Sequence, residues 1–258
     1  MKKVNQYQLN KEIESFIKKK DDAKDSYSKA DIDFIQQYEG SGGQGSKGAK
    51  GEGVLYEFYT PDYICELMYN LAILHGYDGG SILEPSIATG RLIKPFVDFK
   101  KDTKITGFEI NPITTRICQI TYPEANIYNN YFETTFLQQP RFTTRLEVKK
   151  LTWLKDYPFS LVIGNPPYGK YKNKYSSYFK KPKIAQIEIF FMYYGLMLLK
   201  KGGLLIYLTS SNFLRNGNTY NCEKHEIGKI ADIIDAYRLP AVFRFSQVPT
   251  DIIVFKKK

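Results

Sequence analysis

Short apolar runs alternate with helix-like segments along most of the chain. The strand-like runs are Ile82–Glu84, Ile105–Glu109, Ala125–Tyr128, Ser160–Gly164, Leu204–Leu208, Ile230–Ala236 and Asp251–Phe255. The segments with helical periodicity are Pro61–His75, Arg91–Phe96, Pro112–Thr121 and Ile184–Leu199, the last one followed by two glycines that are expected to stop it. This alternation predicts an α/β fold with a doubly wound, mostly parallel, seven-stranded sheet. The last two runs are joined without helical periodicity, which predicts an antiparallel last strand.

The first part of the chain differs in composition from the rest. Residues 1–53 are polar and Lys-rich, and Ser28 and Asp31 have the spacing of a helix cap. Residues 39–53 contain seven glycines, a composition that forms neither helix nor strand. We therefore expect a helical arm with a Gly-rich end over 1–53 and a catalytic domain over 54–258. The Gly-rich end is either a flexible linker or a mobile basic loop over a binding cleft.

Charge and cysteine content limit the partners. The chain has 37 Lys and Arg against 27 Asp and Glu, a formal net charge of +10, which favours polyanions such as DNA. Three widely spaced cysteines fit the reduced thiols of a cytoplasmic protein, and two histidines are too few for a metal triad. We expect a cytoplasmic protein with no metal and no membrane partner, because no apolar run reaches about 18 residues.

Two strand ends carry acidic residues that suit a nucleoside. The run SILEPSIATG passes from an apolar strand into Glu84 and ends at Gly90 before a helix, where small residues let backbone N–H groups approach a ligand. The next strand ends in Glu109, and a carboxylate there can accept hydrogen bonds from two ribose hydroxyls. The phosphate-binding GxGxxG pattern is absent, so the residues favour a nucleoside such as S-adenosylmethionine over a dinucleotide. Taken alone, the glycine turn is also compatible with a simple tight turn.

The strongest chemical signal is Asn165-Pro166-Pro167-Tyr168, which follows a predicted strand. The prolines lack N–H groups and fix φ, so backbone carbonyls stand beside an amide oxygen and an aromatic ring. Two acceptors can bind both hydrogens of an exocyclic purine amine and localise its lone pair for methyl transfer, with no strong base. Tyr168 would stack on the target base, which enters such a pocket only when it is flipped out of its helix. The alternative is a Pro-rich turn without chemistry.

With these motifs the chain resembles the gamma-type N6-adenine DNA methyltransferases, which carry an NPPY element. The resemblance runs from about Tyr56 to Lys257 and implies a Rossmann-like, S-adenosylmethionine-dependent enzyme of the restriction-modification type that releases S-adenosylhomocysteine. It implies base flipping and an adenine substrate in DNA. The catalytic residues that it implies are Asn165, Pro166, Pro167 and Tyr168.

The same resemblance assigns a cofactor site. In YEFYTPDYICELM, Thr60 would cap a helix near the methionine carboxylate, and EPSIATG is similar to the EPSxGTG loop of the family, with Ala88 in place of the central glycine. Asn130-Tyr131 resembles the family's Asp-Phe pair, so the amide would meet the cofactor's amino group and the ring would stack. The implied cofactor-binding residues are Thr60, Glu84, Ser86, Gly90, Glu109, Ile110, Asn130 and Tyr131.

Two segments are candidates for contact with DNA. FRFSQVPTDIIVFKK is similar to the F-x4-V-x-T ending of the family, which sets Phe243 across the flipped base from Tyr168, with Val248 and Thr250 in register and Phe245 as the alternative ring. Residues 169–183 contain six lysines, four aromatic residues and no acid, and we favour a clamp on the nucleic-acid backbone over a solvated basic loop. The implied contacts of the loop are Lys170, Lys172 and Lys174.

The sequence leaves the specificity open. Gamma-type enzymes carry a target-recognition domain after the last strand, and none is evident here. We therefore expect weak specificity, a separate target-recognition subunit, or recognition by the arm and the 132–159 insertion, a long connection that forms an extra helix or a substrate-facing loop. The alternatives are an RNA adenine methyltransferase, an enzyme that methylates protein glutamine, and a non-catalytic nucleic-acid-binding subunit.

Overall fold

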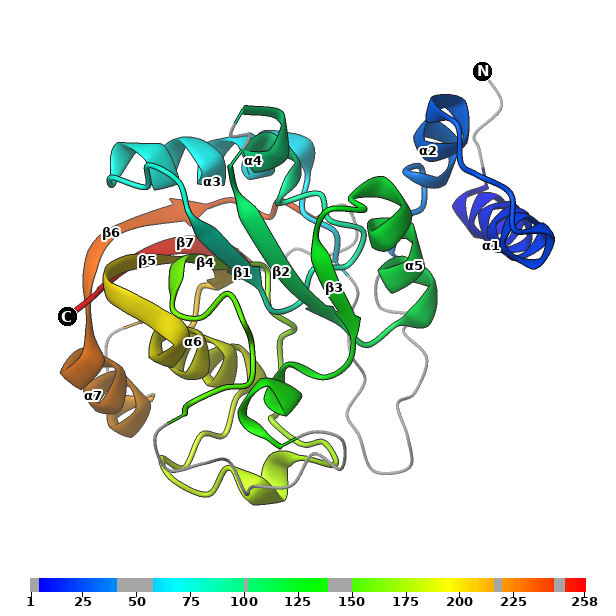
Figure 1. The fold of residues 1–258 in the computed structure, drawn as a ribbon. Coiled ribbons are helices and arrows are strands. Elements are labelled where there is room, and N and C mark those ends of the chain that lie inside the picture. Colours follow the sequence, from blue (N-terminus) through cyan, green and yellow to red (C-terminus); the bar gives the residue numbers. More distant parts are fainter. Residues whose placement is uncertain (1–4, 41–57, 100–101, 139–149, 216–219, 244–248) are drawn as a thin grey trace.

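A seven-stranded sheet forms the centre of the molecule (Figure 1). A computed structural model describes residues 5–40, 58–99, 102–138, 150–215, 220–243 and 249–258. The strand order is β3-β2-β1-β4-β5-β7-β6. The strands are β1 (Ser81–Glu84), β2 (Lys104–Glu109), β3 (Asn126–Asn129), β4 (Phe159–Gly164), β5 (Leu199–Ser210), β6 (Ala231–Leu239) and β7 (Thr250–Lys257). Pairs from β3 to β5 are parallel, and β7 is antiparallel to both β5 and β6, so the predicted fold class is confirmed.

Helices cover both faces of this sheet (Figure 1). One face carries α3 (Asp62–Leu74), α4 (Lys94–Phe99) and α5 (Pro112–Thr121). The other carries α6 (Ile187–Leu198), α7 (Asn221–Ile230) and the short 3-10 helix η1 (Phe132–Phe136), and a second 3-10 helix, η2 (Ser176–Tyr178), follows β4. In β4, Val162 packs into the α6 core while its neighbours Leu161 and Ile163 pack into the α3 core. Both faces are buried, which explains why the central strands are continuous apolar runs in the sequence.

Several elements differ from the prediction, among them α3, whose N-cap is Pro61 without a side-chain cap, where Thr60 was expected to cap it. Helix α4 starts at Lys94, three residues after the expected start, and α7 is not predicted by the sequence. The expected helix 184–199 ends at Leu198 instead of at the glycines, because β5 already begins at Leu199 and passes through them. The glycines allow this course: Gly202 has φ +74, and the pairing of β5 with β4 is irregular at this point.

The N-terminal arm is docked on the side of the domain. Its helices α1 (Gln6–Ala23) and α2 (Lys29–Ile35) lie beside α5 (Figure 1), and Ile13, Ile17 and Ile35 pack against Ile117 of α5. No sequence pattern predicts this docking, since the partner residue lies about 100 positions along the chain.

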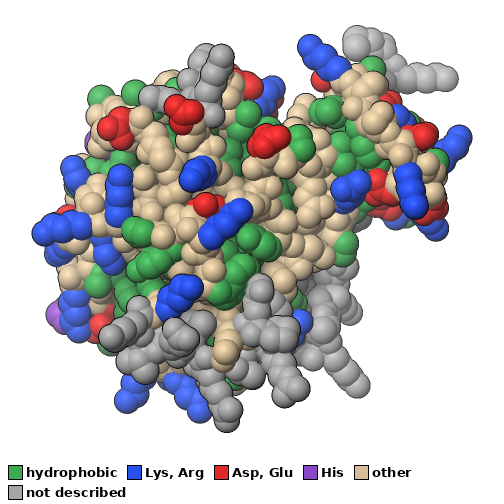
Figure 2. All heavy atoms as spheres, in the orientation of Figure 1, with side chains coloured by type: hydrophobic (Ala, Val, Ile, Leu, Met, Phe, Trp, Pro, Cys, Tyr) green, Lys and Arg blue, Asp and Glu red, His purple; other side chains and the backbone are tan. Residues whose placement is uncertain are grey.

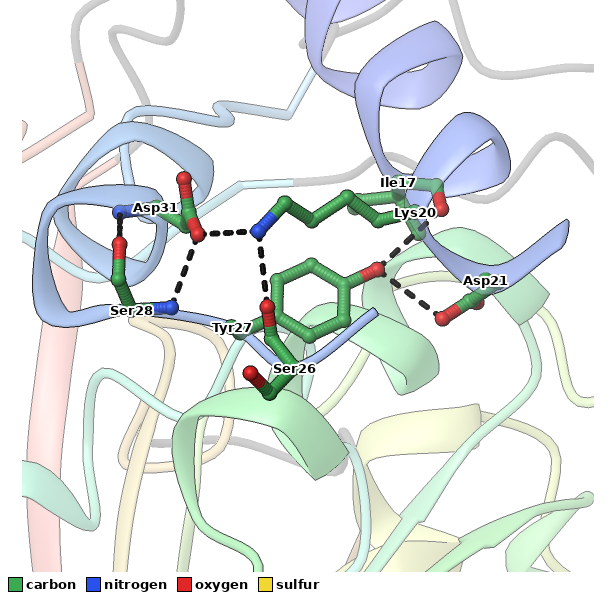
Figure 3. Close-up of polar contacts among 7 residues, drawn as sticks. All are labelled: Ile17, Lys20, Asp21, Ser26, Tyr27, Ser28 and Asp31. Atoms are coloured by element: carbon green, nitrogen blue, oxygen red, sulfur yellow. Dashed lines mark hydrogen bonds and ion pairs between the residues drawn. The ribbon is translucent and has the colours of Figure 1, made fainter. Parts of the chain in front are cut away.

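Polar contacts support the arm (Figure 3). The predicted cap of α2 is confirmed as a capping box between Ser28 and Asp31. Lys20 Nζ donates to Asp31 Oδ2 at 2.6 Å, and this bond, together with the hydrogen bonds from Ser28, lowers the pKa of Asp31 to about 2. Tyr27 donates to Asp21, whose carboxylate also accepts two hydrogen bonds from the guanidinium of Arg116 on α5, at 2.8 and 2.6 Å. The arm and the domain are thus joined by both apolar packing and an ion pair.

Parts of two expected segments fall outside the described residues. These are 41–53 of the Gly-rich end and 139–149 of the 132–159 insertion. Within the described part of the insertion, η1 stands at the start, and Trp153 Nε1 donates to the carbonyl of Thr134 in η1 at 2.7 Å. Among the described helices, none has the length and apolar character needed to cross a membrane.

Candidate active site

A cavity of about 610 Å³ opens at the carboxyl ends of β1, β2, β3 and β4. Strand β1 pairs with both β2 and β4, so the chain reverses its direction of winding between β1 and β4. Such a switch point is where open α/β sheets bind ligands. The predicted site residues that line the cavity are Ser86, Glu109, Ile110, Asn130, Tyr131, Asn165, Pro166, Pro167, Tyr168, Lys170 and Lys172.

Asn165 stands directly after β4 with its amide fixed in orientation. Its Nδ2 donates to the carbonyl of Phe58 at 2.8 Å, and its Oδ1 accepts from the hydroxyl of Tyr168 at 2.8 Å. The backbone carbonyl of the same residue accepts from Ser86 Oγ at 3.3 Å, which connects the loop after β1 to the loop after β4. Since Nδ2 is held by a carbonyl, Oδ1 is the atom that the side chain presents as an acceptor.

Tyr168 is half-buried in the cavity wall. Its hydroxyl also lies 3.4 Å from the carbonyl of Leu208, and burial raises its pKa, so this hydroxyl stays a donor at neutral pH. Pro166 is buried and Pro167 is half-buried. The four residues therefore form a rigid wall of one amide oxygen, proline carbonyls and one aromatic ring.

Glu109, at the end of β2, organises the loop opposite. Its Oε2 accepts from the backbone N–H of Ala88 at 3.0 Å, and its Oε1 accepts from the N–H of Asn111 at 2.7 Å. A carboxylate has about four lone-pair sites and can accept several hydrogen bonds, ligand hydroxyls included. Ile110, the next residue, is 41% exposed, which leaves an apolar side chain uncovered at the cavity wall.

A narrow cleft adjoins the cavity, and Glu84, the other acidic residue of the predicted site, lines it. Thr60, Glu84, Ser86 and Asn165 are among its lining residues, and the last two also line the cavity. Glu84 is 2% exposed, and within the described part of the chain its Oε2 has no hydrogen-bond partner. Burial raises the pKa of Glu84 well above its usual value, and the nearby Glu109 adds to this effect. A buried acceptor without a partner costs free energy that a bound donor would recover.

Tyr131 lies in contact with the basic segment. Lys174 Nζ is 4.8 Å from the centroid of the Tyr131 ring and 5.1 Å from that of Tyr175, a cation–π arrangement. Lys174 thereby reaches the ring that the sequence assigns to cofactor stacking. Lys170 and Lys172 line the cavity directly.

The basic segment is anchored at its start by two buried carboxylates. Glu188 of α6 accepts from the N–H of Gly169 at 3.2 Å, and Glu133 of η1 accepts from Asn173 Nδ2. Lys170 also forms an isolated antiparallel bridge with Gln186. The residues that follow Tyr168 are therefore held in place by both α6 and η1.

Comparison with known proteins gives the family. The sequence model described as Eco57I restriction-modification methylase matches residues 103–243, which is more than half of the chain. The chain belongs to the Eco57I restriction-modification methylase family. The match includes β2, β3, β4 and the NPPY element.

Relatives of this Eco57I-family methylase are larger proteins. The Defense against restriction protein B of Escherichia phage P1 is 28% identical over 80% of this chain, which covers 8% of that protein. The modification methylase CviBIII of Paramecium bursaria Chlorella virus NC1A is 31% identical over 43% of this chain, which covers 25% of that protein. The chain thus spans a quarter or less of the length of these two relatives.

Solved structures share the fold of this methylase. The methyltransferase subunit of a type I restriction-modification system from Streptococcus thermophilus has a TM-score of 0.62 at 19% identity, covering 81% of this chain and 45% of that one. A Listeria monocytogenes protein assigned to the class I S-adenosylmethionine-dependent methyltransferases has a TM-score of 0.59 at 18% identity, covering 77% and 60%. These neighbours confirm the Rossmann-like methyltransferase fold.

Some predicted site residues line neither the cavity nor the narrow cleft. Phe243 is buried and stacks on Phe58 at 5.0 Å between ring centroids, so it lies behind a lining residue. Gly90, with φ +82, closes the turn after β1, and a Cβ at this position would lie 2.6 Å from Tyr122. Thr250 is buried at the start of β7, whereas Phe245 and Val248 lie outside the described residues.

The methylase site also contains residues that the sequence did not indicate. Phe58 lines the cavity, its carbonyl accepts a hydrogen bond from Asn165 Nδ2, and its ring stacks on Phe243. Its position two residues before Thr60 in YEFYTPDY is the sequence signal that could have indicated it. Glu133 and Glu188 come from segments without a motif. Among the described residues, no group of three or more His, Cys, Asp or Glu could hold a metal ion.

Proposed function

We propose that this methylase is a gamma-type DNA adenine-N6 methyltransferase that uses S-adenosylmethionine and releases S-adenosylhomocysteine. The observation that carries the proposal is the placement of Asn165-Pro166-Pro167-Tyr168 and Glu109 in one cavity at the switch point of the sheet. The first element suits a planar amine, and the second suits a ribose, so a base and a nucleoside can meet there.

The residues of the cavity and cleft fit the proposed cofactor. Glu109 would accept from the ribose hydroxyls, and the exposed Ile110 and the Tyr131 ring would cover the adenine. Glu84 Oε2, which has no hydrogen-bond partner among the described residues, fits the ammonium of the methionine end, and Thr60 lines the same cleft. When bound, S-adenosylmethionine supplies an electrophilic methyl group on a sulfonium.

The chemistry assigned to the chain is positioning rather than acid–base catalysis. Asn165 Oδ1 and the Pro166 carbonyl would accept the two hydrogens of the adenine amine, which localises the nitrogen lone pair for in-line attack. Hydrogen bonds from Asn165 Nδ2 to Phe58 and from Ser86 to the Asn165 carbonyl hold these acceptors in place. The amine proton leaves after methyl transfer, so no basic side chain is needed, and Tyr168 would stack on the flipped base.

The test is methyl transfer by Asn165→Ala on unmethylated DNA, followed by nucleoside analysis of the product. We expect 6-methyladenine from the unchanged protein and a rate lowered about 100- to 1,000-fold in the variant, the usual cost of removing one positioned polar group. Binding of S-adenosylhomocysteine should change less than about threefold, since Asn165 is assigned to the base. Asn221→Ala, an exposed amide on α7, is the matched control.

Other products would redirect the proposal. Label found only in structured RNA would favour the RNA adenine alternative, and label only in protein would favour glutamine methylation. Loss of both methyl transfer and S-adenosylhomocysteine binding in Asn165→Ala would mean that the residue is assigned to the wrong ligand. Binding of DNA by the unchanged protein without any methyl transfer, even with a separate recognition subunit added, would favour a non-catalytic subunit.

The setting that we propose is protection of DNA against restriction in the cytoplasm. It is supported by the family and by the phage P1 relative, whose name describes defence against restriction. We also propose that residues 54–258 form the catalytic domain and that sequence recognition comes from a separate target-recognition subunit. The Streptococcus thermophilus neighbour, which is described as the methyltransferase subunit of a type I system, supports this division.

A further inference from the structure

The narrow cleft beside the main cavity is lined by both a basic and an acidic side chain. Its lining residues include Arg91 as well as Glu84, together with the hydroxyl-bearing Thr60 and Thr89. A carboxyl group and a guanidinium in one cleft are the two partners that an α-amino acid requires for its ammonium and its carboxylate. The cleft continues into the main cavity, since Ser86 and Asn165 line both.

Arg91 is placed by a turn and by an aromatic ring. It follows Gly90, whose positive φ turns the chain after β1, and it precedes the buried Leu92. Its guanidinium carbon lies 5.6 Å from the centroid of the Tyr59 ring, and Tyr59 lines both the cleft and the cavity. A guanidinium packed on a ring keeps its planar edge available for a bidentate contact with a carboxylate.

We propose that Arg91 binds the carboxylate at the amino-acid end of the cofactor, while Glu84 accepts from the ammonium of the same end. This inference rests on the proposed function and extends it, because it adds a specificity-determining residue for ligands that carry a free carboxylate. The site then distinguishes an adenosyl amino acid from an adenosyl amine.

A carboxylate of the arm already contacts Arg91. Glu39 Oε1 lies 3.8 Å from Arg91 Nη2, and the two side chains are 45% and 26% exposed. A pair at this distance and exposure is weak and exchangeable. The cleft itself holds about 30 Å³, room for about one water, so the amino-acid group enters only when lining side chains move apart. Glu39 thus pairs with Arg91 in the absence of ligand, and the ligand carboxylate replaces it on binding.

The experiment compares two ligands by calorimetry: S-adenosylhomocysteine, and its decarboxylated analogue, which keeps the thioether and the amine. In Arg91→Gln we expect the affinity for S-adenosylhomocysteine to fall about 10- to 100-fold, the range for a lost charged hydrogen bond, and the affinity for the analogue to stay within about twofold. Arg91→Lys should recover part of the loss. Lys94→Gln removes an exposed charge three residues along the chain and should bind both ligands as the unchanged protein does.

Equal losses for both ligands in Arg91→Gln would overturn the inference, because they would show that Arg91 only supports the fold of the cleft. Unchanged binding of both ligands would overturn it as well. Glu39→Gln should tighten S-adenosylhomocysteine two- to threefold in the unchanged background and have no effect beside Arg91→Gln; a weakened affinity would contradict the displacement. If the unchanged protein binds neither ligand, the proposed cofactor fails, and this inference fails with it.

Discussion

Ala88 adopts a backbone conformation that glycine adopts more readily. Its φ is +49, in the left-handed region, and its N–H donates to Glu109 at 3.0 Å. The bond to the carboxylate therefore holds a conformation that costs an alanine about 1–2 kcal/mol. The strain lies in the loop that lines both the cavity and the cleft.

Replacement of Ala88 tests this strain. Ala88→Gly removes it but adds freedom to the unfolded chain, so we expect a free energy of unfolding between unchanged and about 1 kcal/mol higher. Ala88→Val should lower it by more than about 1 kcal/mol, because a β-branched side chain disfavours positive φ. Urea denaturation monitored by circular dichroism measures both. Ala125→Gly, at a position with ordinary φ, should be destabilising, and a similar destabilisation by Ala88→Gly would contradict the strain.

At the scale of residues, the sequence predicted those parts of the site that follow strands. Glu109 ends β2 and Asn165 follows β4, the parallel strands on either side of β1, so their meeting at one edge of the sheet follows from the strand order. Phe58 contacts Asn165, and Glu133 contacts Asn173 of the basic segment. Glu133 lies in a segment without a motif, so tertiary packing alone brings it to the site. Phe243 lies behind Phe58 in this structure, a position that the family pattern does not specify.

At the scale of elements, the sequence predicted the apolar strands better than the polar helices. Helix α7 buries only Ile227 along its length, so it lacks the apolar stripe by which a helix is recognised. The start of β5 cannot be located from the sequence, because the apolar run of α6 continues into the strand without a break. The arm helices were predicted, but their docking on α5 was not, because it depends on a few isoleucines far apart in the chain.

Docking of the arm depends more on apolar burial than on its ion pair. Ile17 is 3% exposed between α1 and α5, and we expect Ile17→Ala to lower the free energy of arm opening by about 2–4 kcal/mol. Arg116→Gln removes a pair with Asp21 whose side chains are 42% and 35% exposed, and it should cost about 1 kcal/mol or less. Hydrogen exchange of residues 6–35 measures the opening, with Tyr7→Ala, an exposed position, as the control.

The contribution of the Arg116–Asp21 ion pair to arm docking depends on pH and decreases as the pH falls. The hydrogen bonds from Arg116 lower the pKa of Asp21 below its usual value, so the pair stabilises the arm above that value and loses its effect as the pH falls through the lowered pKa. The difference between Arg116→Gln and the unchanged protein should therefore shrink below about pH 4. Equal opening in Ile17→Ala and Arg116→Gln would contradict the expected dominance of apolar packing, and greater opening in Arg116→Gln would show that the ion pair holds the arm.

Across the molecule, exposed lysines lie at both ends of the sheet, at the cavity and opposite to it. The net charge is +10, and on the face in Figure 2 Lys and Arg side chains border apolar surface of the domain. Lys170 and Lys172 are exposed at the cavity, at the carboxyl end of β4. Lys200 and Lys201 are exposed at the beginning of β5, which is the opposite end of the sheet because β4 and β5 run parallel.

This arrangement allows a test at constant net charge. Binding of DNA releases about 0.9 counterions for each phosphate that a lysine neutralises, and the slope of log affinity against log salt measures this number. If the cavity edge faces the phosphates, the double variant Lys170→Gln, Lys172→Gln should reduce the slope by about 1 to 2, whereas Lys200→Gln, Lys201→Gln should leave it unchanged. Fluorescence anisotropy of a labelled duplex at several salt concentrations gives both slopes. Equal reductions in the two variants would mean that the overall charge attracts DNA without orienting the cavity toward it.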